Sequence, residues 1–317
     1  MDQLHQRLDL ALRTGNLAAV ADDAPVDRRD RFRTLLSIYD LLLGPVADDL
    51  ELHRWGAHPV VAALKWRLEA EWLAELEADD ADELPSLGAD PVAAMRSLAA
   101  RDRLPGVYEW VAREASYGEL VEFLALEGGP DGGFADLVAA CQIGLSGRPK
   151  LELAQNFWDE MGNGTLSAVH TALHDDLVRA VDMPHIPLAE QPDEALERSA
   201  LGGLLATNHW LQPEMLGALG LIELQAGPRC RKVLAGLERT GAPAGALPFY
   251  AEHAEVDPRH GKDWMDNGIV PYVEAHPELT SRVLRGALWR WRVNAAFFGR
   301  LGEHLGSAGR TTPMVAA

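Results

Sequence analysis

Cysteine is scarce in this sequence, and its scarcity excludes two kinds of site. Only Cys141 and Cys230 occur among the 317 residues, so neither a disulfide framework nor a thiolate zinc site can be built from them. Such cysteine usage fits a reducing cytoplasm. A glycine-rich phosphate loop and a serine-nucleophile motif are also missing, which argues against nucleotide binding and hydrolysis.

Basic residues and long apolar runs are few as well. The chain has 29 Lys and Arg residues against 48 Asp and Glu residues, a formal net charge of -19. This excess of negative charge argues against nucleic acid or an anionic membrane as a partner. No apolar run approaches the ~20 residues that a membrane span needs, and the N-terminus lacks the basic-then-apolar order of a signal peptide. We therefore expect a soluble, cytoplasmic protein.

Alternation with period two is almost absent, whereas apolar residues recur with helical spacing along most of the chain. This pattern predicts an all-α protein. Residues 1–100 contain helical patterns but no cluster of candidate ligands. We expect them to form an N-terminal helical extension to a main domain over residues 101–317.

Glycine and proline mark the expected breaks between helices. The segment Gly162–Gly164 predicts a kink or short break before a helix over residues 165–181. Further along, Pro228 predicts that a helix over residues 213–226 is separate from one over residues 228–240.

The most informative segment is the predicted helix that begins near Pro248. It places His253, Asp257 and His260 at i, i+4 and i+7, which on a helix fall within an arc of roughly 60°. Neighbouring aromatic residues turn this face inward, and polar groups buried there need a compensating partner. A transition metal accepts neutral nitrogen and anionic oxygen together. Pro258 directly follows Asp257 and predicts a kink at that point.

Three further polar residues stand where an apolar residue is expected. Each shares the apolar stripe of its predicted helix with leucine or phenylalanine residues three, four or seven positions away. These three residues are Glu127, Glu160 and His170. Glu127 lies in the last turn of its helix, from which a carboxylate could instead reach solvent.

The candidate ligands are thus three carboxylates and three imidazoles from three regions of the chain. The full set is Glu127, Glu160, His170, His253, Asp257 and His260. Such a set suits two iron or manganese ions, and helix bundles build two-metal sites from side chains that project inward on facing helices.

Two stretches of the sequence resemble the heme-oxygenase-like diiron oxidases and oxygenases, a family of iron-containing redox enzymes. The first is the pattern Trp-Asp-Glu-x-Gly-x-Gly-x5-His over residues 158–170, and the second is His253-x3-Asp257-x2-His260. Residues 119–127 also resemble the first ligand helix of that family, so the likeness extends over residues 105–305.

This resemblance implies a heme-oxygenase-like helical bundle in which the six candidate residues bind two Fe(II) ions and O2 is a co-substrate. It implies an oxidoreductase that acts on a small amino- or carboxylate-bearing metabolite, by N-oxygenation or by oxidative C–C cleavage. An external electron donor and a homodimer are compatible with it. Two alternatives stay open: a heme-binding or metal-free enzyme of the same fold, and a non-catalytic helical binding protein.

Overall fold

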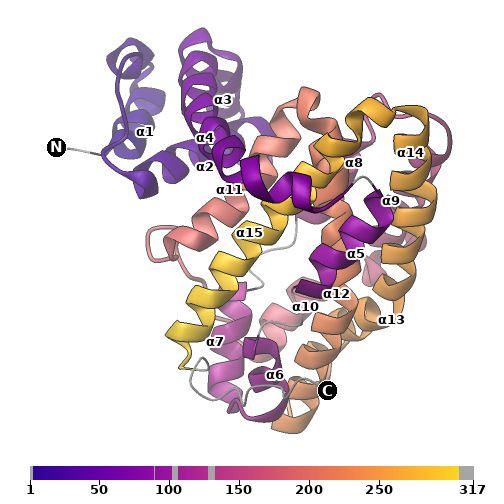
Figure 1. Cartoon of the computed structure of the whole chain (residues 1–317). Coiled ribbons are helices and arrows are strands. Elements are labelled where there is room, and N and C mark those ends of the chain that lie inside the picture. The colour runs from indigo at the N-terminus through magenta and orange to yellow at the C-terminus, as the bar shows by residue number, and fades with distance from the viewer. Residues whose placement is uncertain (1–2, 89, 102–105, 128–132, 307–317) are drawn as a thin grey trace. The chain divides into compact units, whose positions relative to one another are not determined.

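The computed structural model describes residues 3–88, 90–101, 106–127 and 133–306, and every regular element within these ranges is a helix (Figure 1). The all-α class is therefore confirmed. Among these helices, none combines the length and the apolar character that crossing a membrane requires. Contacts group the chain into two compact units, residues 1–85 with 188–209 and residues 86–187 with 210–317. The expected domains, 1–100 and 101–317, stay a prediction.

The first unit is built from helices that bury a small apolar core. Its elements are α1 (Leu4–Thr14), η1 (Leu17–Val20), α2 (Arg28–Leu43), α3 (Leu50–His53), η2 (Arg54–Ala57), α4 (Pro59–Ser86) and α11 (Asp193–Thr207). Helix α2 packs against α1 and α11. Phe32 of α2 meets Trp72 of α4 edge to face, with ring centroids 4.9 Å apart, and both rings are buried.

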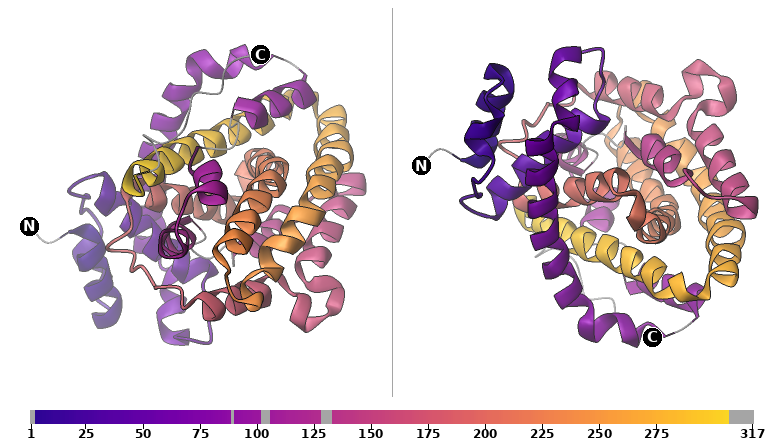
Figure 2. Two further views of the ribbon diagram at one scale, coloured as in Figure 1. Left: turned by 90° about the horizontal axis from the view of Figure 1, so that it is seen from below. Right: turned by 90° about the horizontal axis from the view of Figure 1, so that it is seen from above.

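The second unit contains the candidate site. Its elements are α5 (Pro91–Arg101), α6 (Gly106–Arg113), α7 (Tyr117–Glu127), α8 (Phe134–Cys141), α9 (Gly147–Glu160), η4 (Gly162–Gly164), η5 (Leu166–Ala168), α10 (His170–Val181), η6 (His209–Leu211), α12 (Gln212–Thr240), η7 (Ala244–Ala246), α13 (Pro248–Asp263), η8 (Trp264–Ile269), α14 (Val270–Ala275), η9 (Pro277–Leu279) and α15 (Thr280–His304). The long helix α12 packs against both α13 and α15, and Figure 2 gives two views of this arrangement.

Helix α12 runs unbroken with Pro228 inside it, so the expectation of two shorter helices was wrong. Gly227 leaves room for the neighbouring helix, since a Cβ there would lie 2.9 Å from Cδ of Pro258 in α13. Helix α13 likewise continues through Pro258. A proline inside a helix costs roughly 3 kcal/mol, and the packing of α12 along two neighbouring helices outweighs that cost.

The predicted break at Gly162–Gly164 is confirmed. Helix α9 ends at Glu160, two short 3-10 turns follow, and α10 begins only at His170. This reversal brings the last residue of α9 and the first residue of α10 to the same side of the unit, opposite α13.

Candidate metal centre

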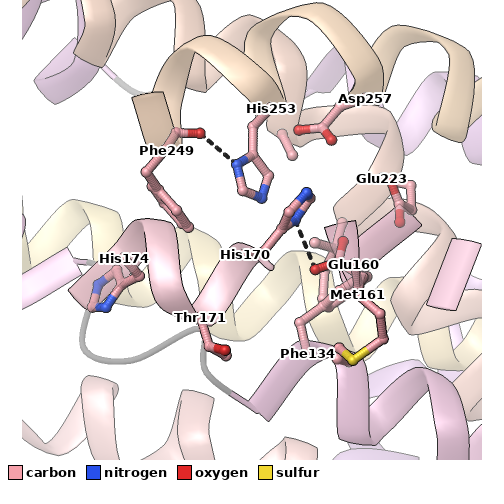
Figure 3. Close-up of a pocket in the computed structure, with 13 residues that line it drawn as sticks. Phe134, Glu160, Met161, His170, Thr171, His174, Glu223, Phe249, His253 and Asp257 are labelled. Atoms are coloured by element: carbon pink, nitrogen blue, oxygen red, sulfur yellow. Dashed lines mark hydrogen bonds and ion pairs between the residues drawn. The ribbon is translucent and has the colours of Figure 1, made fainter. Parts of the chain in front are cut away.

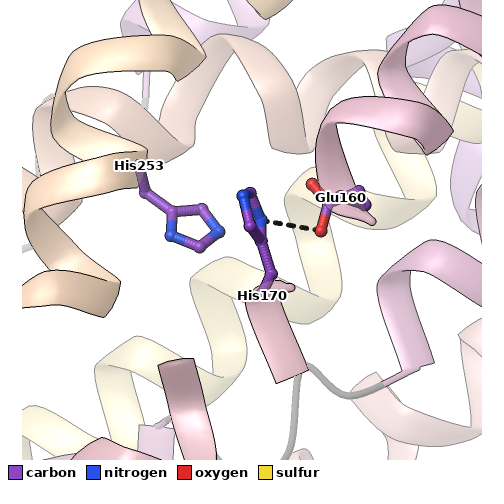
Figure 4. A group of neighbouring side chains, drawn as sticks. All are labelled: Glu160, His170 and His253. Carbon is purple, nitrogen blue, oxygen red and sulfur yellow. Dashed lines mark ion pairs between the residues drawn. The ribbon is translucent and has the colours of Figure 1, made fainter. Parts of the chain in front are cut away.

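A first cluster joins residues from α9, α10 and α13. Glu160, His170 and His253 each offer one ligand atom, and the three atoms lie within 4.8 Å of one another (Figure 4). His170 Nδ1 is 2.8 Å from Glu160 Oε2, and the rings of His170 and His253 have centroids 4.4 Å apart. Glu160 and His170 are buried, and His253 is partly buried.

The ring of His253 is held by the backbone of its own helix. Its Nδ1 lies 2.7 Å from the carbonyl oxygen of Phe249, one turn earlier in α13. A carbonyl oxygen can only accept a hydrogen bond, so Nδ1 carries the proton and Nε2 keeps its lone pair. Figure 3 shows the ring directed toward His170. A histidine that donates one N–H to a backbone carbonyl is oriented to bind a metal through its other nitrogen.

A second cluster joins α12 and α13. Glu223, Asp257 and His260 are all buried, and their ligand atoms also lie within 4.8 Å of one another. His260 Nδ1 is 3.8 Å from Glu223 Oε2 and 3.8 Å from Asp257 Oδ1. These distances exceed hydrogen-bond length, and no described residue hydrogen-bonds to this buried nitrogen. The opposite ring nitrogen, Nε2, lies 3.0 Å from Asp159 Oδ2.

Both clusters face one pocket. Glu160, His170 and His253 line it together with Glu223 and Asp257, and Figure 3 shows their side chains converging on the same space. The pocket has a volume of about 50 Å³. One water needs roughly 10–15 Å³ of such space, so only a few water-sized groups fit beside the ligands.

The remaining wall of the pocket is mostly apolar. Its apolar members are Phe134, Ala135, Met161, Ile222, Ala226 and Phe249. Exposed Thr171 and half-buried His174 also line the pocket, so it reaches the surface beside the first turn of α10. The wall limits the water around the ligand groups and thereby strengthens electrostatic interactions among them.

The electrostatics of the pocket favour a bound cation. Burial raises the pKa of the Glu223 carboxyl to about 8, and the negative charge of Glu160 adds to this rise. A hydrogen bond of 2.7 Å from Asn156 Nδ2 to Glu223 Oε1 acts in the opposite direction. Carboxylates buried together cannot all ionise cheaply without a positive charge between them. A cation would remove this cost and would also engage the lone pair of His260 Nδ1.

The types of ligand atom in the two clusters indicate which cations could bind there. Three carboxylates and three imidazoles surround the pocket in the two clusters, and neither cluster includes a thiolate. Mixed oxygen and imidazole ligands suit iron and related divalent ions. The two clusters together therefore fit a pair of such ions, one for each cluster.

Five of the six residues predicted from the sequence fall into these clusters. The spacing of His253, Asp257 and His260 placed all three on the pocket side of α13, but the structure divides them, with His253 in one cluster and the other two in the second. The axial rise explains why His253 and His260 are divided, because seven residues of helix span about 10 Å, which is too far for one ion.

Glu127 lies outside both clusters. It is the last residue of α7, half-buried, and its Oε1 accepts a hydrogen bond of 2.7 Å from the hydroxyl of Tyr108. Its role as an iron ligand stays a prediction. In the geometry, the third carboxylate is Glu223 instead.

Glu223 was missed although the sequence carries a signal for it. It follows Leu216, Leu219 and Gly220 by seven, four and three positions, the spacing that singled out Glu127 and Glu160.

Comparison with known proteins supports the chemistry of this centre. A family model described as iron-containing redox enzyme matches residues 121–295, more than half of the chain. The matched region contains every residue of both clusters. No curated protein matches the chain.

Proposed function

Because this chain belongs to the iron-containing redox enzyme family and has its all-α, heme-oxygenase-like fold, we propose that it is a non-heme diiron oxidase or oxygenase. One observation carries the proposal: two clusters, each with buried carboxylate and imidazole groups, face a single small pocket. A heme site would need one axial histidine. It would not account for the three carboxylates that line this pocket.

Each cluster would hold one iron. Glu160, His170 and His253 would bind the first ion, and Glu223, Asp257 and His260 the second. Two bound Fe(II) ions would supply the electrons that reduce O2 and, with it, the oxidising power for the substrate. The carboxylates would keep the pair electrically balanced in the protein interior, where unpaired charge is costly.

The protein's own part is to prepare the pocket and to direct the substrate. The apolar wall keeps bulk water away from the ligands, and the Phe249 carbonyl fixes the ring of His253. Thr171 and His174 offer polar groups where the pocket reaches the surface. We propose a small amino- or carboxylate-bearing metabolite as the substrate, with N-oxygenation or oxidative C–C cleavage as the outcome and an external electron donor as reductant.

Iron loading tests this function directly. Metal-free protein is loaded with Fe(II) under anaerobic conditions, desalted and analysed for iron, and then mixed with O2 while its visible spectrum is followed. We expect two irons per chain, a new visible chromophore on exposure to O2 and no Soret band. A Soret band, or fewer than one iron per chain, would contradict the proposal.

Variants show whether the iron occupies the two clusters. His253→Ala and Asp257→Ala are each expected to reduce the iron content to about one per chain, because each removes a ligand from a different cluster. His174→Ala is the matched control, since His174 lines the same pocket one turn beyond His170 but belongs to neither cluster. Its iron content should equal that of the wild type.

A further inference from the structure

We propose that Asp159 is the positioning residue of His260: it fixes the tautomer and direction of that ring, so that Nδ1 faces the carboxylates of Glu223 and Asp257. The adjacent residue, Glu160, is a ligand in the other cluster. One dipeptide at the end of α9 would therefore serve both ion sites. This role rests on the proposed function, because it concerns a residue that supports a ligand of one proposed iron site.

The contact between Asp159 and His260 defines the tautomer. Asp159 Oδ2 lies 3.0 Å from His260 Nε2, and a carboxylate can only accept, so Nε2 carries the proton. Nδ1 is then the ring nitrogen that can offer a lone pair to a metal, and it stands 3.8 Å from carboxylate oxygens of Glu223 and Asp257. A metal-binding histidine commonly donates its outer N–H to such a carboxylate, which orients the ring and raises its basicity.

Asp159 is suited to hold a ring in place because it is itself held. Its carboxylate accepts hydrogen bonds from Gln155 Nε2 at 3.0 Å, from Arg259 Nη2 at 3.1 Å and from the side chain of Asn163. Gln155, Arg259 and Asn163 are all exposed to solvent, where such contacts contribute little. His260, by contrast, is buried, so its hydrogen bond to Asp159 is the strong one of this group.

The turn after α9 places Asn163 for this contact. Gly162, Asn163 and Gly164 have φ values of 58°, 51° and 83°, a run of left-handed residues that glycine adopts freely and asparagine tolerates. A Cβ at Gly162 would lie 2.4 Å from the carbonyl carbon of Ala168. The chain therefore reverses tightly at this turn, and the side chain of Asn163 hydrogen-bonds to the carboxylate of Asp159.

This arrangement gives a physical reason for the pattern Trp-Asp-Glu-x-Gly-x-Gly. The glutamate binds one ion, the aspartate orients a ligand of the other, and the two glycines allow the turn from which Asn163 reaches Asp159. Without Asp159, the ring of His260 can take the other tautomer or turn away from the pocket. The affinity of the Glu223–Asp257–His260 site should then fall by roughly 10–100-fold, while the other site keeps its affinity.

Nuclear magnetic resonance of the metal-free protein tests the tautomer. Long-range proton–nitrogen spectra distinguish Nε2–H from Nδ1–H in each histidine. We expect His260 to be the Nε2–H tautomer in the wild type and a mixture in Asp159→Ala. An Nδ1–H tautomer in the wild type, or an unchanged spectrum in the variant, would overturn the role. Because this measurement uses metal-free protein, it tests the role of Asp159 even if the proposed diiron function is wrong.

Competition titration under anaerobic conditions tests the consequence for binding, with Co(II) as the probe and a chromophoric chelator as competitor. In Asp159→Ala we expect one site of wild-type affinity and one weakened site, with Asp159→Asn intermediate because its amide oxygen still accepts a hydrogen bond. Asn163→Gly keeps the turn but loses the side-chain contact, so a smaller weakening of the same site is expected.

Two controls separate positioning from general damage. Arg259→Gln and Gln155→Ala each remove an exposed contact to the same carboxylate, and both should bind two ions with wild-type affinity. Equal weakening of both sites in Asp159→Ala would overturn the role, because a residue that positions His260 acts on one site. Unchanged affinity at both sites would overturn it as well.

Discussion

The carboxylate of Glu223 on α12 lies close enough to that of Glu160 on α9 for the charge of Glu160 to help raise the Glu223 pKa. The two residues belong to different clusters, so this pair is where the two proposed iron sites meet. It also makes Glu223 the most informative position for mutation.

Glu223→Gln is expected to abolish tight binding of one of the two irons. Glutamine keeps the size of the side chain but removes the anionic oxygen, and the loss should exceed the roughly 10–100-fold that follows removal of a supporting hydrogen-bond partner. Glu127→Gln is the matched change at the other candidate: an unchanged iron content would assign the third carboxylate to Glu223, and a loss of iron would confirm the sequence-based prediction for Glu127. Iron analysis after anaerobic loading measures both, and the reverse result would make Glu127 the ligand.

The metal-free protein should lose stability as the pH rises from about 4.5 to about 8. Burial raises the pKa of Glu223 from 4.5 to about 8 in the folded state, so folding favours the protonated carboxyl, and this contribution is lost as the pH rises through the folded pKa. Glu223→Gln mimics the neutral form. Its free energy of unfolding should match that of the wild type near pH 4 and exceed it by up to several kcal/mol above pH 8.

Urea denaturation at a series of pH values, with a chelator present, gives this difference. A difference that does not grow with pH would show that Glu223 is ionised throughout in the folded protein. Saturating Fe(II) should reverse the trend, because a metal that binds the ionised ligand releases the proton and binds more tightly at higher pH.

Gly162→Ala should destabilise the protein by more than about 1 kcal/mol. The new Cβ would lie 2.4 Å from the Ala168 backbone, and residue 162 has a φ of 58°. The turn must therefore change shape, or the alanine must adopt a strained backbone conformation. Gly299→Ala is the control, since a Cβ there meets nothing within 4 Å and the residue lies inside α15, near the C-terminal end of that helix. That change should stabilise by roughly 0.5–1 kcal/mol. Thermal melting of both variants decides between these outcomes.

Cys141 should not react with iodoacetamide in the native protein at pH 8. Its side chain is buried, and burial raises the pKa of the thiol to about 12, so almost no thiolate is present or accessible. Cys230 is only partly buried and is expected to react first. Mass spectrometry of native and urea-unfolded samples counts the labelled sites, and rapid labelling of Cys141 in native protein would contradict the packing of α8.

The all-α class and most residues of the two clusters could be predicted, because both depend on the local spacing of apolar and polar residues. An inward-facing Glu160 or His253 interrupts an apolar stripe, and that interruption is visible in one dimension. Which residues belong to the same cluster depends on their distance along the helix axis and on the helix that faces them. The sequence alone therefore did not show that the residues of α13 are divided between two clusters.

The features that the sequence did not indicate depend on tertiary contacts. Asp159 lies on the polar side of α9, and its partner His260 is 101 positions away, so no local pattern connects them. Glu223 of α12 joins Asp257 and His260 of α13 only through tertiary packing, and packing against α13 and α15 likewise overrides the expected break of α12 at Pro228. Glu127 has the same stripe signal as Glu160, but it ends its helix next to the hydroxyl of Tyr108.

The pocket of about 50 Å³ has a consequence for how a substrate is chosen. In the proposed enzyme, only the reacting end of a molecule would fit beside the two clusters, and the rest of it would lie toward the surface near Thr171 and His174. Selection among homologous compounds of different length would then be made at the entrance, by residues that never touch the atoms being oxidised.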